Sequence, residues 1–159
     1  MKNTFFILTV LIAVSIFYSC SKNSETLSPQ SNFASLSFTA NDSSIHFPIS
    51  TASIQEVLSL QTTVIIGQFA DTSSHQGSIS IRVIGDTIGR YSRDSLLVTY
   101  TNSQGVVFNN VADSGNYVQI DKFPKNANGV VSGSFNILVI QGKDTIKLSK
   151  GAFTALYQD

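Results

Sequence analysis

Apolar and polar residues alternate along most of the chain, and this period of two constrains the fold more than any other feature. In the clearest run, 78–83, Ile79, Ile81 and Val83 are separated by polar residues. Successive side chains of a β-strand point to opposite faces, so such a run buries one face and exposes the other. The sequence therefore predicts an all-β fold, a single antiparallel β-sandwich or barrel-like domain of about 8–10 strands over residues 35–159.

Turn-forming residues indicate where the strands end. The segment 102–104 is expected to connect a hairpin, and further turns are expected at 141–144 and 150–151. Pro48 has no backbone N–H, so a strand containing it must lie at a sheet edge or end there. Residues 53–60 are the only segment with a helical alternative, because a short apolar run fits either period.

Residues 1–19 have the composition of a signal peptide. Lys2 supplies a positive charge, and the segment from Phe5 to Phe17 is apolar except for two hydroxyl residues. A transmembrane helix needs about 20 apolar residues, so this segment is short for one and fits the hydrophobic region of a signal peptide. We expect its removal, with a retained signal anchor and ordinary secretion as the alternatives.

The apolar segment ends at Ser19-Cys20 and is followed at once by polar residues. This junction resembles the lipobox of bacterial lipoproteins, in which a small residue precedes the cysteine that is acylated. A cysteine thiolate is the nucleophile that can form a thioether to a diacylglyceryl group. The resemblance implies cleavage between Ser19 and Cys20 and attachment of lipid, with chains such as palmitate, to Cys20. Residues 20–34 are then expected to be a flexible tether to the membrane.

The charge balance argues against one class of partner. The chain has 10 basic and 10 acidic residues, for a formal net charge of zero. Binding to the phosphate backbone of nucleic acids depends on positive charge, so no nucleic-acid partner is expected. One cysteine and two histidines exclude a disulfide framework and a cysteine-rich zinc site. We expect no cofactor.

Few residues indicate catalysis. Asp71, Ser73 and His75 share one polar loop, but a hydrolase triad needs a base that is held by a buried carboxylate. The acidic residues fall mainly in expected turns and lack the D-x-D-x-D-G spacing of a calcium loop. We therefore expect no catalytic residue and no metal ligands. Sugar binding without catalysis stays open through three tyrosines, Tyr91, Tyr100 and Tyr117.

Motifs that combine glycine, small polar and aromatic residues follow one another in a fixed order. They are Gly89-Arg90-Tyr91, Tyr100-Thr101-Asn102, Ser132-Gly133-Ser134-Phe135 and Gly151-Ala152-Phe153. Together with the lipobox, this order resembles a family of small all-β lipoproteins of unknown function from Bacteroidota. The resemblance covers residues 36–157, implies a β fold and a cell-envelope location, and supplies no catalytic residues.

The glycines of the last two motifs also have a structural interpretation. Gly133 and Gly151 are expected to allow a β-bulge or a close backbone approach, with Phe135 and Phe153 filling the core beside them.

Three positions carry Asp, then Ser or Thr, then an apolar residue. This pattern resembles the O-glycosylation signal of Bacteroidota envelope proteins, and the residues that would be modified are Thr87, Ser95 and Thr145. The same tripeptide is also an ordinary entry into a β-strand, so both interpretations stay open.

These features predict a lipid-anchored protein of the cell envelope that acts as a non-catalytic binding or structural module of unknown ligand. The alternatives are a lipocalin-like carrier of a small apolar ligand and, less favoured, an envelope hydrolase. Ser21 is not the acidic residue of a retention signal, which favours the outer membrane. Few acidic residues follow Cys20, which favours the periplasmic face over the cell surface.

Overall fold

The computed structural model describes residues 34–69, 77–113 and 115–158, which all belong to one compact unit, Phe33–Asp159. The all-β prediction is confirmed. The predicted signal peptide lies outside the described residues, as does all but the last residue of the predicted tether. The elements are β1 (Ser35–Ala40), β2 (Ser43–Phe47), β3 (Ile49–Val57), β4 (Leu60–Gln68), β5 (Ser78–Ile84), β6 (Gly89–Tyr91), the 3₁₀ helix η2 (Arg93–Ser95), β7 (Leu96–Thr101), β8 (Val107–Asn110), β9 (Tyr117–Lys122), β10 (Val130–Gln141) and β11 (Asp144–Tyr157).

All the strands belong to one 11-stranded sheet, in the order β2-β1-β11-β3-β4-β5-β7-β8-β10-β9-β6. An additional pairing between β10 and β11 joins two strands that lie far apart in this order. The sheet therefore closes into a ring of β11, β3, β4, β5, β7, β8 and β10, as in a barrel. The remaining strands extend beyond the ring at the two ends of the order.

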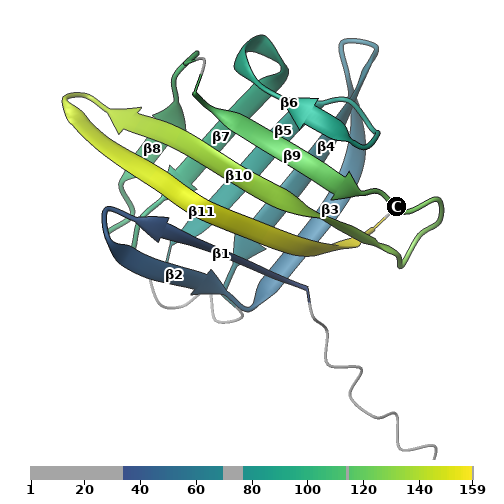
Figure 1. The fold of residues 1–159 in the computed structure, drawn as a ribbon, viewed down its shortest axis with the longest axis horizontal. Coiled ribbons are helices and arrows are strands. Elements are labelled where there is room, and N and C mark those ends of the chain that lie inside the picture. The colour runs from purple at the N-terminus through teal and green to yellow at the C-terminus, as the bar shows by residue number, and fades with distance from the viewer. Residues whose placement is uncertain (1–33, 70–76, 114, 159) are drawn as a thin grey trace, which may run out of the picture. The chain divides into compact units, whose positions relative to one another are not determined.

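The same sheet is also folded into two layers, as in a sandwich (Figure 1). We call β2, β1, β11, β10, β9 and β6 the front layer, and β3, β4, β5, β7 and β8 the back layer. The two long strands connect them: β11 pairs with β1 and then with β3, and β10 pairs with β9 and then with β8. Each long strand thus begins or ends in one layer and reaches the other.

The antiparallel prediction is confirmed for every pairing between strands except one. Thr51 and Ala52 of β3 pair in parallel with Leu156 and Tyr157 of β11. This exception closes the ring, because the end of the chain returns to the beginning of β3 rather than to a hairpin neighbour.

The expected strand number is slightly too low, and two local expectations are wrong. The helical alternative for 53–60 fails because β3 pairs with β4 along its whole length, from Ile49–Gln68 to Val57–Leu60. The expected turn at Lys150–Gly151 is instead an irregularity inside the single strand β11, where Lys150 has φ 53° and the register against β10 shifts. The motif Gly89-Arg90-Tyr91, which the family resemblance implies to be a strand, forms the short strand β6.

Other turn expectations are confirmed. Pro48 separates β2 from β3, and β2 lies at one end of the sheet order. The hairpin of β7 and β8 turns at Asn102, whose side-chain oxygen accepts hydrogen bonds from the backbone N–H groups of Gln104 at 3.0 Å and Val106 at 2.9 Å. This is the local bonding that makes Asn frequent in turns.

Aromatic rings fill the space between the two layers. The Phe38 ring packs against Phe47, Phe135 and Tyr100, with ring centroids 6.0, 5.8 and 5.6 Å apart. The alternating apolar residues surround these rings. The inward-facing residues of β5 and β10, including Ile79, Ile81, Val83, Ile137 and Val139, are all fully buried.

The β10–β11 pair is built on two reciprocal contacts between glycine and phenylalanine. Gly133 lies opposite Phe153, and Phe135 lies opposite Gly151. A β-carbon at Gly151 would lie 2.5 Å from the Phe135 ring, and one at Gly133 would lie 2.9 Å from the Phe153 ring. Each ring therefore covers a glycine of the neighbouring strand, a pairing known to compensate for glycine in sheets. The expected close approach at both glycines is confirmed.

Strand β8 is short and leaves parts of its two neighbours, β7 and β10, without a strand partner on that side. The side-chain amides of two asparagines form hydrogen bonds with the backbone there. Asn116, 3% exposed, accepts a hydrogen bond from the Leu138 N–H at 2.7 Å and donates one to the Val111 carbonyl at 2.8 Å. Asn110 accepts from the Val98 N–H at 2.7 Å and donates to the Leu96 carbonyl at 3.1 Å. The amides thus satisfy backbone groups of β7 and β10 that no strand reaches.

We predict that Gly151→Ala lowers the free energy of unfolding by about 1–3 kcal/mol, because the added methyl group overlaps the Phe135 ring. Gly89→Ala is the control, since its nearest contact would be an ordinary 3.9 Å and its cost should stay within about 0.5 kcal/mol. Urea denaturation measures both. Phe135→Leu in the Gly151→Ala background should recover part of the loss, and equal costs for the two glycine variants would contradict the argument.

We also predict that Asn116→Ala costs about 2–3 kcal/mol, because it leaves the buried Leu138 N–H without an acceptor. Asn136→Ala is the matched control, since Asn136 is half-buried on β10 and its side chain makes no hydrogen bond within the described chain. Hydrogen exchange should show faster exchange of the Leu138 amide in the first variant only. Unchanged protection there would show that the bond contributes nothing.

Candidate functional site

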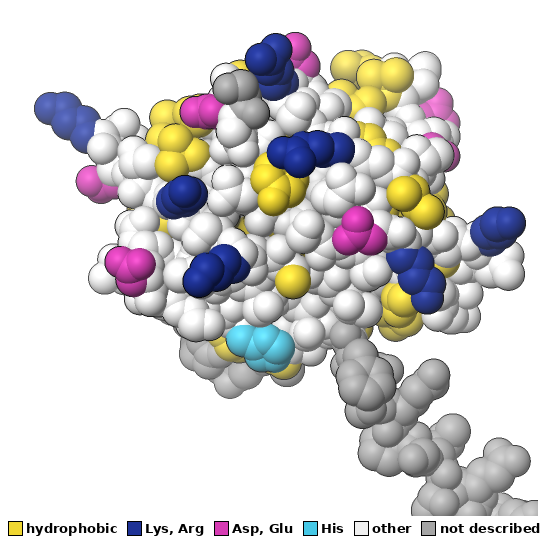
Figure 2. Space-filling view, viewed as in Figure 1, with side chains coloured by type: hydrophobic (Ala, Val, Ile, Leu, Met, Phe, Trp, Pro, Cys, Tyr) yellow, Lys and Arg dark blue, Asp and Glu magenta, His cyan; other side chains and the backbone are white. Residues whose placement is uncertain are grey.

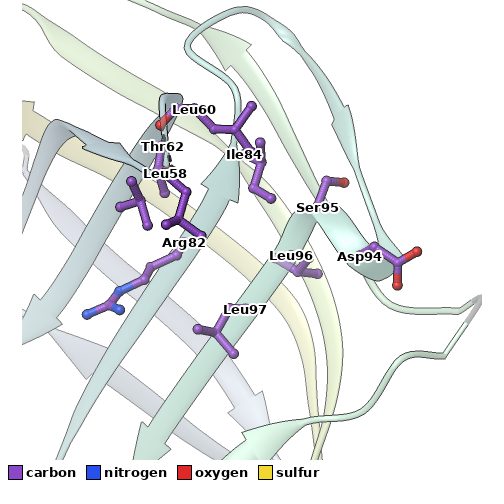
Figure 3. A pocket seen from close by; sticks show the side chains of 10 residues that line it. Leu58, Leu60, Thr62, Arg82, Ile84, Asp94, Ser95, Leu96 and Leu97 are labelled. Atoms are coloured by element: carbon purple, nitrogen blue, oxygen red, sulfur yellow. Dashed lines mark hydrogen bonds between the residues drawn. The ribbon is translucent and has the colours of Figure 1, made fainter.

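An apolar groove lies on the outer face of the back layer. Its walls come from the β3–β4 hairpin, from the end of β5, and from η2 with the start of β7 (Figure 3). It encloses a volume of about 210 Å³. Five aliphatic side chains, which we call the groove aliphatics, give it its character: Val57, Leu58, Leu60, Ile84 and Leu97.

The groove aliphatics are all exposed and, unlike the exposed Ile88 and Val107, line the same groove. Leu58 is 93% exposed, and the other four are 42–50% exposed. Single exposed apolar residues are common on protein surfaces, but a contiguous group marks an interaction site. The sheet places them together: Val57 lies opposite Leu60, and the strand next to Leu97 carries Ile84.

Sequence reasoning missed this groove, although a signal was present. Where Val83-Ile84 and Leu96-Leu97 stand in adjacent positions, the alternation breaks, and only one residue of each pair can face inward. In the structure Val83 and Leu96 are buried, while Ile84 and Leu97 face outward into the groove. Doublets of apolar residues in otherwise alternating strands were therefore the sign of the site.

Leu58 is also conformationally unfavourable. Leu58 and Ser59 form the two-residue turn of the β3–β4 hairpin with φ of 50° and 63°. The equivalent turn between β1 and β2 uses Asn41 and Asp42, with φ of 42° and 72°, which are residue types that tolerate this region. A leucine there costs about 1–2 kcal/mol. Neither the exposure nor the backbone conformation of Leu58 helps the fold.

Charged residues stand at the rim of the groove. Arg82 and Asp94 both contribute to its lining and lie on different sides of it in Figure 3. Arg82 forms no ion pair within the described part of the chain, and Leu97 lies opposite it on β7. The groove therefore has an aliphatic floor and balanced charges at its edge.

The three predicted glycosylation residues lie in different surroundings. Thr145 is exposed at the start of β11, and its hydroxyl makes no hydrogen bond within the described chain. Thr87 is exposed, but its hydroxyl lies 3.3 Å from that of Tyr91, which donates to the Thr87 carbonyl at 2.7 Å. Ser95 is half-buried in the groove wall and donates to the Ser92 carbonyl at 2.7 Å.

The three tyrosines considered for sugar binding are each buried or in contact with other groups of the protein. Tyr100 is in the core, where burial raises the pKa of its phenol. Tyr91 holds the Thr87 loop. Tyr117 lies in the front layer and carries the Arg90 guanidinium 3.8 Å from its ring centroid, a cation–π contact.

The outer face of the front layer is mostly polar, with Lys, Arg, Asp and Glu side chains scattered over it (Figure 2). One row of directly paired residues crosses all of its strands and shows the composition: His46, Ser37, Ala152, Ser134, Gln119 and Arg90. The front layer thus presents a mostly polar outer face, whereas the back layer carries the aliphatic groove.

Several predicted residues cannot be placed. Ser19, Cys20, Asp71, Ser73 and His75 lie outside the described residues. Within the described ranges, no three His, Cys, Asp or Glu side chains gather closely enough to hold a metal ion. Among the same residues, no helix has the length and apolar character needed to span a membrane.

Comparisons with protein-family models, curated proteins and solved structures found no match to this chain. The groove and the sequence signals therefore carry the functional argument by themselves.

We predict that Leu97→Ser weakens binding of ANS, an apolar fluorescent dye, by about fivefold, because about 1 kcal/mol of apolar burial is lost. Val107→Ser is the control: Val107 is 45% exposed, close to the 50% of Leu97, but lies outside the groove. Fluorescence titration gives both Kd values, and equal effects would show that the dye does not use the groove.

Proposed function

We propose that this chain is a lipid-anchored protein of the cell envelope. The support comes from the sequence: a charged start at Lys2, an apolar segment, and the Ser19-Cys20 junction that precedes a polar segment. In this proposal residues 1–19 are removed and Cys20 carries the lipid. Residues 20–34 then connect it to the β domain, at the periplasmic face of the outer membrane. Two or three acyl chains give stable anchoring, whereas one gives only marginal binding.

We further propose that the domain is a non-catalytic binding module and that the groove takes an aliphatic ligand. The observation that carries this proposal is the group of exposed groove aliphatics outside a filled core. Removing such side chains from water contributes roughly 25 cal/mol per Å² of apolar surface, so a hydrocarbon ligand gains affinity here without any specific polar contact. Arg82 and Asp94 stand at the rim, so the apolar surface available to a ligand is confined to the floor of the groove.

The carrier alternative places an apolar ligand inside the fold. In a lipocalin-like barrel the interior holds the ligand. Here the Phe38 ring packs against the Phe47 and Phe135 rings in that position, which favours a surface site over an interior one. The hydrolase alternative depends on Asp71 and His75, which are not among the described residues, and it stays a hypothesis.

The intact mass of the protein from native membranes tests the anchor. A mass equal to residues 20–159 plus acyl groups is expected. A mass equal to all 159 residues would overturn the lipid anchor and leave an uncleaved signal. Cys20→Ser is the control, because it removes the thiol that acylation requires.

The same measurement tests O-glycosylation, for which the exposed and unbonded Thr145 hydroxyl is the best placed of the three candidates. We predict that native protein carries hexose-sized mass increments and that Thr145→Ala removes at least one. Ser95→Ala, which removes a hydroxyl already bonded to the Ser92 carbonyl, should leave the increments unchanged. A native mass explained by acyl groups alone would contradict the prediction.

A further inference from the structure

We propose that the occupant of the groove is the lipid bilayer itself, with Leu58 as the side chain that enters the hydrocarbon. This inference rests on the proposed lipid anchor, because that anchor holds the domain beside a bilayer. It adds a second contact, through which the back layer lies against the membrane.

The chemistry of the groove favours hydrocarbon over a protein partner. Hot spots of protein interfaces are rich in Trp, Tyr and Arg and poor in Leu and Val. The apolar side chains of the groove are all aliphatic, and Leu58 projects furthest into solvent. Aliphatic side chains without polar partners match a liquid hydrocarbon, which offers apolar contact and no shape to recognise.

The turn itself points in the same direction. The β1–β2 hairpin makes a turn of the same length with Asn41 and Asp42, residue types that tolerate this conformation. At Leu58 the chain keeps an apolar residue in a disfavoured conformation at a fully exposed tip. Strain of this kind persists where another requirement outweighs it. Insertion of the side chain into a membrane is such a requirement.

The length of chain before the domain allows both contacts at once. The Leu36–Phe47 pair puts the start of β1 beside the end of β2, one residue before β3 begins. The hairpin tip lies at the other end of β3, about 30 Å away at 3.3 Å per residue. The segment 21–34 can span up to ~45 Å when extended, so Cys20 and Leu58 can reach the same bilayer.

Charge does not drive this contact. Arg82 and Arg93 are balanced by Glu56 and Asp94 around the hairpin and η2, and all four side chains are exposed. Long arginine side chains can keep their head groups among lipid head groups while their stems cover apolar surface. We therefore expect docking that does not weaken when salt is raised, in contrast to electrostatic binding.

The test uses the full chain, purified with its lipid and placed in phosphatidylcholine vesicles. A polarity-sensitive fluorophore is attached at Glu56→Cys, which leaves Leu58 intact, and at Lys143→Cys in the β10–β11 turn as the control. Nitroxide groups on the lipid chains should quench the first probe and not the second. Adding Leu58→Asn to the Glu56→Cys chain should abolish that quenching and raise the thermal midpoint by about 4 °C, because Asn tolerates the turn.

Each result decides the proposal. The proposal is overturned if nitroxide lipids do not quench the fluorophore at position 56. It is also overturned if the emission of this fluorophore shifts to the blue without vesicles and the shift grows with protein concentration, because the occupant is then a second copy. Quenching that survives Leu58→Asn assigns the contact to another surface. The mass of the same preparation separates the two claims. If the mass shows no acyl groups, the proposed lipid anchor is wrong. Quenching of the Glu56 probe after vesicles are added then still tests whether the groove docks on a bilayer. With acyl groups and no quenching, only the docking fails.

Discussion

The pairing of β10 with β11 is the constraint on which the rest of the structure depends. Gly133 and Gly151 leave room for the Phe153 and Phe135 rings of the paired strand, and Gly133 also leaves room for the Gln119 carbonyl of β9. Besides each other, each of these strands pairs with two further strands, so the front layer continues into the back layer at both ends. The ring closes, and the aromatic core is enclosed, because this one hairpin extends across the fold.

The back layer carries two groups of apolar residues, one that the fold requires in its core and one that it only tolerates on its surface. Most of its inward-facing apolar residues are fully buried, and substitutions there act on packing. Its outward-facing groove aliphatics contribute little to that packing, and Leu58 works against the turn in which it stands. Residues that a fold does not need, and that cost it stability, are best explained by function.

The sequence was sufficient for features that depend on neighbouring residues. The alternation at Ile79, Ile81 and Val83, the turn at Asn102 and the strand break at Pro48 all follow from local geometry, and the structure has them. Features that depend on distant segments were not predictable. The parallel pairing of Thr51 with Leu156 and the bonding of Asn116 to Leu138 need the folded chain to bring their partners together. The groove was partly predictable. The apolar doublets that indicate it can be read from the sequence, but only the folded sheet shows that they lie side by side.

Ring closure has a consequence for a protein held at high density on a surface. An open strand edge is a template for pairing with other chains, and tethering to a membrane, as proposed, raises the frequency of such encounters. The sheet order ends in β2, with five residues before Pro48, and in β6, with three. Edges this short offer few backbone groups to a neighbour. Under the proposed membrane tether, these short edges limit strand pairing between neighbouring molecules.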